Sequence, residues 1–271
     1  MIILAATPIG NLGDASRRLI EVLENAEVVA AEDTRTTQRL LQALKIDNRP
    51  RLIALHDHNE KHKAAELAEM AEQHDVVVVS DAGMPAVSDP GYGVVAAAVE
   101  RGVTVTAIPG PSAVLMALAI SGLPTDRFTF EGFLPRKPGE RRSVLTALAS
   151  EPRTMVFFES PSRLASSLAD MGAAYGDARR IAVCRELTKM YEEVRRGTAS
   201  ELVAWAEQGV KGEIVVVVEG AAPLAVSADD ALAQVQALVA SGTRLKEACA
   251  EVAAATGLSS RDLYQSALAA R

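Results

Sequence analysis

Short apolar runs recur along the first half of the chain and alternate with segments of helical periodicity. The runs cover residues 2–6, 28–31, 51–55, 76–79 and 103–108. The run 76–79 is an uninterrupted series of valines, which is typical of a central parallel strand buried on both faces. Strands that alternate with helices form βαβ units with right-handed crossovers. The pattern therefore predicts an α/β domain with a mostly parallel sheet over residues 1–121.

The pattern changes after Gly122-Leu123-Pro124, which ends the helix that starts near Ser112. Apolar runs now follow one another through shorter connections, with helices expected at 141–149 and around Trp205. The expected strands cover residues 128–133, 154–158, 181–184 and 214–218, and the segment 193–197 precedes the helix that contains Trp205. Short, hairpin-like connections favour a sheet that mixes parallel and antiparallel strands. We predict a second α/β domain over residues 122–222.

Three helical segments follow a linker at 221–227 and make up a predicted C-terminal segment over residues 223–271. The helices are expected at 229–240, 244–256 and 259–269. Gly257 stands where a helix-ending glycine belongs, and Ser259 is a good N-cap for the next helix. This order is that of a helix-turn-helix, although helical tails of this kind also serve only to dock on a partner subunit.

Several expected strands of the first domain run into loops rich in glycine, proline and polar residues. The loops are T-P-I-G-N-L-G-D at 7–14, S-D-A-G-M-P-A-V-S-D-P-G at 80–91 and P-G-P-S at 109–112. Ligands bind outside the carboxyl ends of the strands in open α/β sheets, so loops of this kind on one edge can form a site. Ordinary turn chemistry would explain any single loop. Repeated junctions of the same kind favour a small-molecule site.

Composition restricts the class of protein. The 271 residues allow two domains of ordinary size, and 28 basic against 35 acidic residues give a net charge of −7, which argues against a surface coated in nucleic acid. No apolar run approaches the roughly 20 residues that cross a bilayer. Cys184 and Cys249 have no neighbouring histidine or cysteine at metal-ligand spacing, so we expect reduced, structural thiols and a cytoplasmic protein without membrane attachment.

Familiar nucleotide and hydrolase motifs are missing. The first loop lacks G-x-G-x-x-G and the chain lacks G-x-x-x-x-G-K-[ST], so neither a dinucleotide fold nor a P-loop is supported. The G-x-S-x-G elbow of α/β-hydrolases is also absent. His56 and His58 alternate on a strand or diverge on a helix and do not share a metal easily, so no metal site is expected. Pattern and spacing by themselves predict a two-domain α/β protein with an interdomain site.

A series of longer motifs narrows the class. The chain contains, in this order, T-P-I-G-N-L, A-E-D-T-R, S-D-A-G-M-P-A-V-S-D-P-G, P-G-P-S-A, G-F-L-P-R-K, E-S-P-S-R, R-E-L-T-K and K-G-E-I-V-V-V-V-E-G. This series closely resembles the tetrapyrrole methylase superfamily and, more narrowly, its RNA-modifying branch, the small-subunit ribosomal RNA cytidine 2′-O-ribose methyltransferases. The resemblance extends over essentially the whole chain, including the C-terminal helices.

The resemblance implies two α/β domains of the tetrapyrrole methylase type with S-adenosylmethionine bound in the cleft between them. It also implies an RNA 2′-hydroxyl as methyl acceptor, small-subunit ribosomal RNA or the assembled subunit as substrate, and a homodimer. Carried over position by position, it implies cofactor contacts in loops and strand ends of both domains, at Pro8, Ile9, Gly10, Ala82, Gly83, Met84, Val87, Ser112, Ala113, Glu159, Gly212 and Glu213.

Other functions remain open at this point. Porphyrin-modifying members typically carry G-x-G-P-G in the first loop and G-D-P in the second, where this chain has T-P-I-G-N and G-M-P. A corrin or sirohaem methyltransferase on the same scaffold is therefore an alternative, disfavoured by these loops and by the extra C-terminal helices. A non-catalytic RNA-binding protein is another alternative. A nicotinamide-dependent oxidoreductase has no fingerprint to support it.

The expected reaction needs positioning and a proton acceptor. Methyl transfer from a sulfonium is an in-line displacement, and a ribose hydroxyl is a weak nucleophile that needs a base or a strong hydrogen-bond acceptor. The candidates are Asp33, His56 and Glu186, although Asp33 would also serve simply as a helix cap and Glu186 as an ion-pair partner of Arg185. The expected RNA contacts are Arg35, Arg136, Lys137, Arg163, Arg185 and Lys189, with Arg35 and Arg136 preferred because a guanidinium matches phosphate.

Overall fold

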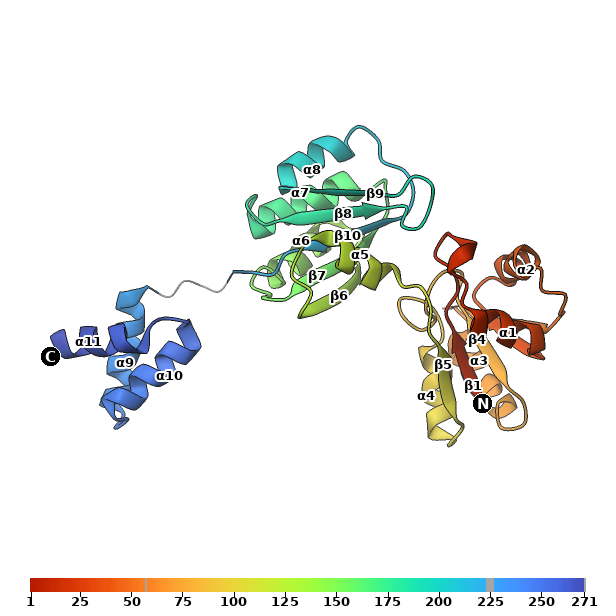
Figure 1. Cartoon of the computed structure of the whole chain (residues 1–271), viewed down its shortest axis with the longest axis horizontal. Coiled ribbons are helices and arrows are strands. Elements are labelled where there is room, and N and C mark those ends of the chain that lie inside the picture. The colour runs from red at the N-terminus through yellow and green to blue at the C-terminus, as the bar shows by residue number, and fades with distance from the viewer. Residues whose placement is uncertain (57, 223–226, 271) are drawn as a thin grey trace. The chain divides into compact units, whose positions relative to one another are not determined.

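The computed structural model describes residues 1–56, 58–222 and 227–270. Residues Met1–Ala149 with Arg153–Glu219 form one compact unit, and Ser150–Pro152 with Gly220–Arg271 form another. Figure 1 shows two β-sheets, each with helices beside it, in the first unit and a group of helices in the second. The linker expected at 221–227 lies largely outside the described residues, as does Asp57 between the two predicted histidines.

The first sheet is entirely parallel, as the alternating pattern predicts, with strand order β3-β2-β4-β1-β5. Its strands are β1 (Ile2–Ala5), β2 (Val28–Ala31), β3 (Arg51–Ala54), β4 (Val76–Val79) and β5 (Val105–Ile108). The helices that connect and follow them are α1 (Arg17–Asn25), α2 (Thr34–Ala43), α3 (Glu60–Met70), α4 (Tyr92–Glu100) and α5 (Ala113–Ser121). A short 3-10 turn, η1 (Leu12–Asp14), lies in the loop after β1.

The central strand β4 is buried on both faces. Val76 and Val78 join the core cluster that contains Leu67 of α3. Val77 and Val79 join the cluster on the other face, which contains Leu19 of α1. Successive side chains of a strand point to opposite faces, so helices on both sides explain the uninterrupted valine run.

The second sheet is mixed, as its short connections predict, with strand order β6-β7-β10-β8-β9. Only β6 and β7 are parallel, and the other pairs are antiparallel. The strands are β6 (Phe128–Phe133), β7 (Thr154–Glu159), β8 (Ile181–Arg185), β9 (Glu193–Gly197) and β10 (Ile214–Val218), and the helices are α6 (Pro138–Ala147), α7 (Leu164–Tyr175) and α8 (Ala199–Ala206). Helix α6 begins earlier than the predicted Arg141 because proline fits the first turn of a helix.

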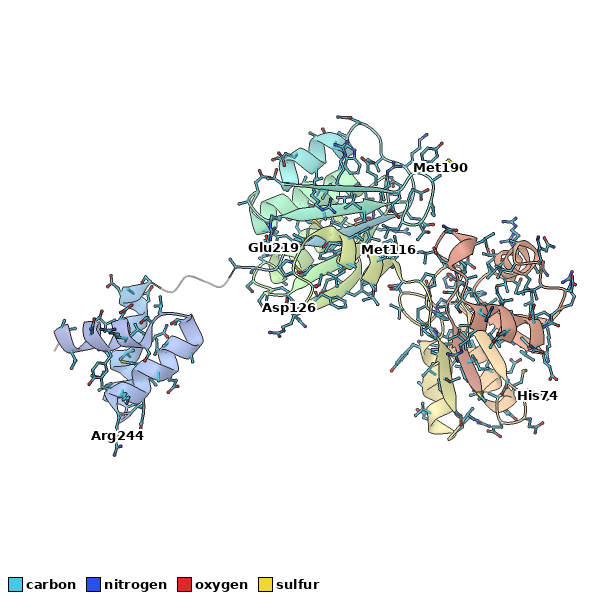
Figure 2. All side chains as sticks on the ribbon, viewed as in Figure 1. His74, Met116, Asp126, Met190, Glu219 and Arg244 are labelled. Carbon is cyan, nitrogen blue, oxygen red and sulfur yellow. The ribbon has the colours of Figure 1, made fainter. Side chains whose placement is uncertain are left out.

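Helix α5 covers one face of the second sheet, although it follows the last strand of the first sheet. Val114 and Leu118 of this helix share a core cluster with Val215 of β10, and Ile9 from the loop after β1 enters the same cluster. Met116, labelled in Figure 2, packs against it. Helices α6, α7 and α8 contribute to the core cluster on the other face. The predicted boundary at residue 121 therefore falls after a helix that packs with the second sheet.

The C-terminal unit contains α9 (Ala228–Ala240), α10 (Leu245–Thr256) and α11 (Ser260–Ala269), which agree with the predicted helical segment. They share a small core that includes Val235, Cys249 and Leu263. Gly257 ends α10 in the left-handed region with φ 73°, and the Ser259 side chain caps α11. Within the described ranges, no helix combines the length and apolar character that crossing a bilayer requires.

Replacing Phe157 by alanine is expected to lower the free energy of unfolding by about 4 kcal/mol, because its ring is fully buried in the second sheet. Trp205, the only tryptophan, packs against the same core cluster, so its fluorescence in a urea titration measures the change. Phe128→Ala is the control, since Phe128 is 37% exposed at the start of β6. Equal losses in the two variants would contradict this assignment of the core.

Candidate active site

The loops that follow β1, β4 and β5 meet at the carboxyl edge of the first sheet. Thr7 N donates to Gly83 O over 2.9 Å, Gly83 N donates to Thr7 O over 3.1 Å, and the Thr7 hydroxyl donates to Ser80 O over 3.2 Å. A Cβ at Gly110 would lie 2.8 Å from that of Ala6, so the third loop approaches closely because it has glycine there. The three glycine-containing loops therefore form one connected surface.

Two acidic residues come together where β2 and β4 end. Asp33 N donates to Asp81 Oδ1 over 3.2 Å, and Asp81 N donates to Glu32 Oε2 over 3.2 Å. Asp33 is also the N-cap of α2, as its sequence context predicts. Asp81 belongs to the second loop motif but was not among the predicted proton acceptors. Its position beside Asp33 follows from the pairing of β2 with β4.

The two carboxyl groups have opposite pKa shifts. Hydrogen bonds from the side chain and backbone of Arg35 hold the pKa of Asp33 at about 2. Loss of hydration raises the pKa of Asp81, and the negative charge of Asp33 adds to that rise, while the hydrogen bond from Asp33 N opposes it. Neighbouring titratable groups with divergent pKa values are a common feature of acid–base sites.

His56 lies at the end of β3, which is an edge strand separated from β4 by β2. Its side chain is exposed, and its backbone N–H donates to Asn59 Oδ1 over 2.9 Å. The ring contacts His58 with 6.0 Å between centroids. The structure thus places His56 on the same edge as Asp33 and Asp81, but farther along it.

One edge of the second sheet collects the predicted residues of the second domain. Ile214 at the start of β10 pairs with Glu159 at the end of β7 and with Arg185 at the end of β8. Glu186 directly follows Arg185, and Glu213 directly precedes Ile214. Residues that are far apart in sequence therefore share one edge.

Glu186 connects two loops on this edge. Its Oε1 accepts from Glu213 N and from Lys189 Nζ, both over 2.9 Å, and Lys189 Nζ also lies 3.2 Å from Glu213 Oε1. These bonds from Glu213 and Lys189 lower the pKa of Glu186. The partner of Glu186 is thus Lys189, whereas Arg185 pairs with Glu193 over 3.2 Å. A Cβ at Gly212 would overlap the Glu186 side chain, so glycine is required there.

Contacts also join loops of the two sheets. A Cβ at Gly10 would lie 2.6 Å from Cε of Lys189, so the lysine stem lies across the first loop. Ile9 and Leu187 are buried in the same apolar cluster. The predicted residues Ile9, Gly10 and Lys189 are therefore brought together in this structure.

Left-handed backbone conformations concentrate in two of these loops. Ala86 and Ser88 have φ values of 68° and 63°, and Glu186 and Thr188 have values of 51° and 69°. Such conformations are unfavourable for residues other than glycine and are often retained at functional sites. Buried Oγ1 of Thr188 has no hydrogen-bond partner among the described residues. Strained backbone thus occurs in the loop after β4 and in the R-E-L-T-K loop after β8. The R-E-L-T-K loop also contains the unsatisfied Thr188 hydroxyl.

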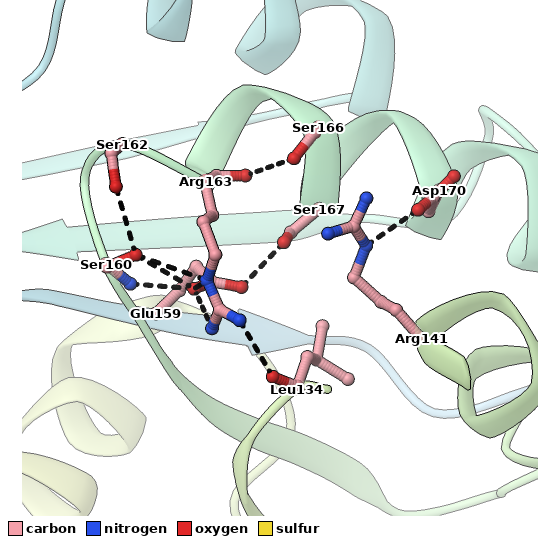
Figure 3. A network of polar contacts seen from close by, with 9 residues as sticks. All are labelled: Leu134, Arg141, Glu159, Ser160, Ser162, Arg163, Ser166, Ser167 and Asp170. Atoms are coloured by element: carbon pink, nitrogen blue, oxygen red, sulfur yellow. Dashed lines mark hydrogen bonds and ion pairs between the residues drawn. The ribbon is translucent and has the colours of Figure 1, made fainter. Parts of the chain in front are cut away.

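Glu159 and Arg163 form a buried polar network, drawn in Figure 3. The Glu159 side chain is 1% exposed, and it accepts from Arg163 Nε over 2.8 Å and from the Ser167 hydroxyl over 2.6 Å. Arg163 Nη1 donates to Leu134 O over 3.1 Å. Nearby, Arg141 of α6 pairs with an aspartate of α7 over 2.7 Å. Both predicted site residues, Glu159 and Arg163, thus make contacts that hold the protein's own loops.

The remaining predicted cofactor positions differ in exposure. Pro8 and Gly83 are buried, Met84 is half-buried, and Ala82 and Val87 are exposed. Ser112 and Ala113 open α5, where the Ser112 hydroxyl accepts from Leu115 N over 3.4 Å.

The predicted RNA-contacting cations also divide into two groups. The Arg35 side chain is 80% exposed, Arg136 is exposed, and Lys137 is 79% exposed with an ion pair to Glu140. The Arg163, Arg185 and Lys189 side chains are 20–25% exposed and have carboxylate partners.

Two cavities lie elsewhere on the α/β unit. One of about 570 Å³ is lined by residues that include Glu27 and His74, which precede strands of the first sheet and so lie on its opposite edge. The other, of about 310 Å³, is lined by residues that include Gly122 and Arg196. The predicted cofactor residues line neither cavity.

Fold and site define a class of protein. The chain has one parallel and one mixed sheet, with helices on their faces and glycine-containing loops at the carboxyl edge of the first sheet, so it is a two-domain α/β protein. Residues 1–203 match the family model of Tetrapyrrole (Corrin/Porphyrin) Methylases, and residues 225–271 match the RsmI C-terminal HTH domain. The chain belongs to the Tetrapyrrole (Corrin/Porphyrin) Methylases, which confirms the resemblance inferred from its motifs.

Similar proteins place it more narrowly. The chain is 52% identical to Ribosomal RNA small subunit methyltransferase I of Mycobacterium tuberculosis, over 100% of this chain and 95% of the relative. It is 43% identical to the protein of the same name from Escherichia coli O157:H7, over 98% and 93%. Among solved structures, the methyltransferase CobJ matches with a TM-score of 0.59 and 22% identity, over 82% of this chain and 94% of that one. Diphthine synthase matches with a TM-score of 0.58 and 15% identity, over 80% and 89%. The structural likeness concerns the fold.

Glu159→Gln is expected to lower the free energy of unfolding by about 3 kcal/mol, because it leaves the Arg163 guanidinium without a carboxylate in a largely buried position. Trp205 fluorescence in urea measures the loss. Arg142→Met is the control, since its side chain is 60% exposed and lies 3.9 Å from its carboxylate partner, and it should change stability by less than about 0.5 kcal/mol. An unchanged Glu159→Gln variant would show that the network contributes little to folding.

Proposed function

We propose that the protein is an S-adenosylmethionine-dependent methyltransferase that 2′-O-methylates the ribose of a cytidine in small-subunit ribosomal RNA. The observation that carries this proposal is the match over full length to proteins named Ribosomal RNA small subunit methyltransferase I, together with the convergence of the motif loops. The same proposal includes a cytoplasmic location, which the cysteine usage favours, and a homodimer, which the resemblance implies.

The cofactor assignment is supported by the chemistry of the loops. Gly10, Gly83 and Gly110 let the backbones of three loops approach neighbouring residues closely, which brings their main-chain groups together at one edge. Main-chain groups in such loops can bind the polar parts of a nucleoside. When bound, S-adenosylmethionine supplies an activated methyl group on a sulfonium. The residues that would hold it are those of the first, second and P-G-P-S loops.

Asp81 is the preferred proton acceptor for the ribose hydroxyl. A useful base has a pKa near the working pH, and the pKa of Asp81 is raised, whereas those of Asp33 and Glu186 are lowered. Asp33 and Glu186 also have cationic partners, Arg35 and Lys189, that hold them in their ionised forms. Asp33 then orients Asp81 through its backbone N–H.

Exposed arginines provide the contacts to RNA in this proposal. Arg35 is the second residue of α2, beside the acidic pair, and Arg136 lies in the loop between β6 and α6. Phosphate contacts of this type position a strand and do not read its sequence. Lys137 adds a second cation to the same loop. We assign Arg163, Arg185 and Lys189 to holding the loops of the site.

Asp81→Asn is expected to lower kcat about a hundredfold with an unchanged affinity for S-adenosylmethionine, because the amide accepts no proton. In the wild type, kcat/KM should rise as the pH increases through the raised pKa of Asp81, because the ionised carboxylate is the active form. It should level off once Asp81 is fully ionised. The variant should lack this rise. Asp75→Asn, at the other end of β4, is the matched control and should retain activity. Normal turnover in Asp81→Asn would remove Asp81 from the mechanism.

The purified wild-type protein is expected to bind S-adenosylmethionine and to restore one ribose methylation at a cytidine in small-subunit RNA from cells that lack its gene. Calorimetry measures the first step and mapping of ribose methylation the second. Binding without methylation of either free RNA or isolated subunits would argue against the proposed acceptor. Absence of cofactor binding would instead favour a non-catalytic RNA-binding protein.

A further inference from the structure

An exposed aromatic ring lies at the carboxyl end of β6. Phe133 is 60% exposed, and its ring lies 5.5 Å from that of Phe158, which in turn meets Phe130 edge-on at 4.9 Å. Exposed apolar side chains are common on protein surfaces, but an exposed ring that rests on a second ring offers a flat apolar surface of fixed position. One side of the Phe133 ring thus has a rigid support while much of the residue stays open to solvent.

A β-bulge gives the ring this orientation. In a regular strand, residues 130 and 133 would point to opposite faces, yet both rings contact Phe158. The register between β6 and β7 shifts between Phe130 and Gly132, and Gly132 has φ 66°. Bulges commonly redirect side chains next to active sites. A Cβ at Gly132 would lie 3.9 Å from the Ser88 hydroxyl, so the bulge lies beside the second loop.

The residues after Phe133 are fixed and positively charged. Leu134 is buried, and its carbonyl accepts from Arg163, which the buried Glu159 holds in place (Figure 3). Arg136 and Lys137 follow on the exposed side of this anchor. An aromatic ring and two cations are therefore presented on one short segment whose start is held by the polar network.

We propose that Phe133 is a stacking surface for an unpaired nucleobase of the RNA substrate, with Arg136 and Lys137 binding the adjoining phosphates. This inference rests on the proposed function and names how the acceptor strand is held. Proteins recognise single-stranded RNA through bases stacked on aromatic side chains beside cationic groups that follow the backbone. An exposed ring followed within four residues by two exposed cations matches the alternation of bases and phosphates in single-stranded RNA.

The test compares variants that keep or remove the ring. Phe133→Leu retains an apolar contact to Phe158 and should raise the Kd for a single-stranded fragment of small-subunit RNA about tenfold. Phe133→Tyr retains the ring and should bind like the wild type. Phe128→Leu, at the opposite end of the same strand, is the matched control and should leave RNA affinity unchanged. All variants should keep the wild-type affinity for S-adenosylmethionine.

The possible results are distinct. An RNA affinity of Phe133→Leu equal to that of the wild type overturns the inference. If Phe133→Leu instead dissociates a dimer in sedimentation experiments without a direct loss of RNA affinity, the ring faces a second copy and the inference is also wrong. If the wild-type protein methylates no RNA, the proposed function is wrong. The comparison of RNA affinity between Phe133→Leu and Phe133→Tyr measures binding alone, so the two failures can be told apart.

Discussion

The reciprocal backbone hydrogen bonds between Thr7 and Gly83 are the constraint on which the candidate site depends. They tie the loop after β1 to the loop after β4, and the Thr7 hydroxyl adds a bond to Ser80. Backbone groups in buried loops need such partners, because an unpaired N–H or C=O there is costly. With the two loops joined, Ile9 and Gly10 extend from the first sheet toward Leu187 and Lys189.

Charges around the site are mostly paired, and the exceptions are informative. Cations stabilise the ionised forms of Asp33 and Glu186, and the buried Glu159 has the Arg163 guanidinium beside it. These paired groups hold backbone segments in place, and their charges are already neutralised by their partners. Asp81 differs because loss of hydration destabilises its ionised form. The raised pKa of Asp81, on the loop after β4, thus contrasts with the lowered pKa values of Asp33 and Glu186.

Local strain is concentrated in the same places. Ala86, Ser88, Glu186 and Thr188 adopt left-handed conformations in two loops that come from different sheets. The bulge at Gly132 adds a third irregularity next to the second loop. Strain of this kind persists only where surrounding contacts determine the backbone. Core packing on both sheets and the Glu159–Arg163 network provide that support.

The sequence by itself determined most elements, the parallel first sheet and the mixed second sheet, because hydrophobic periodicity and turn residues act locally. The family was inferred separately, from the resemblance of the ordered motifs. The sequence also identified most loops of the site, since glycine and proline mark strand ends. Only the tertiary structure decided which loops are neighbours. Strand order places Asp81 beside Asp33 although their numbers differ widely, and antiparallel pairing brings Glu159 and Arg185 to Ile214. The sequence likewise could not place α5 on the second sheet, because an all-apolar helix shows no preferred face. Ion-pair partners and the bulge at Gly132 depend on distances between segments that fold together, and no local pattern encodes them.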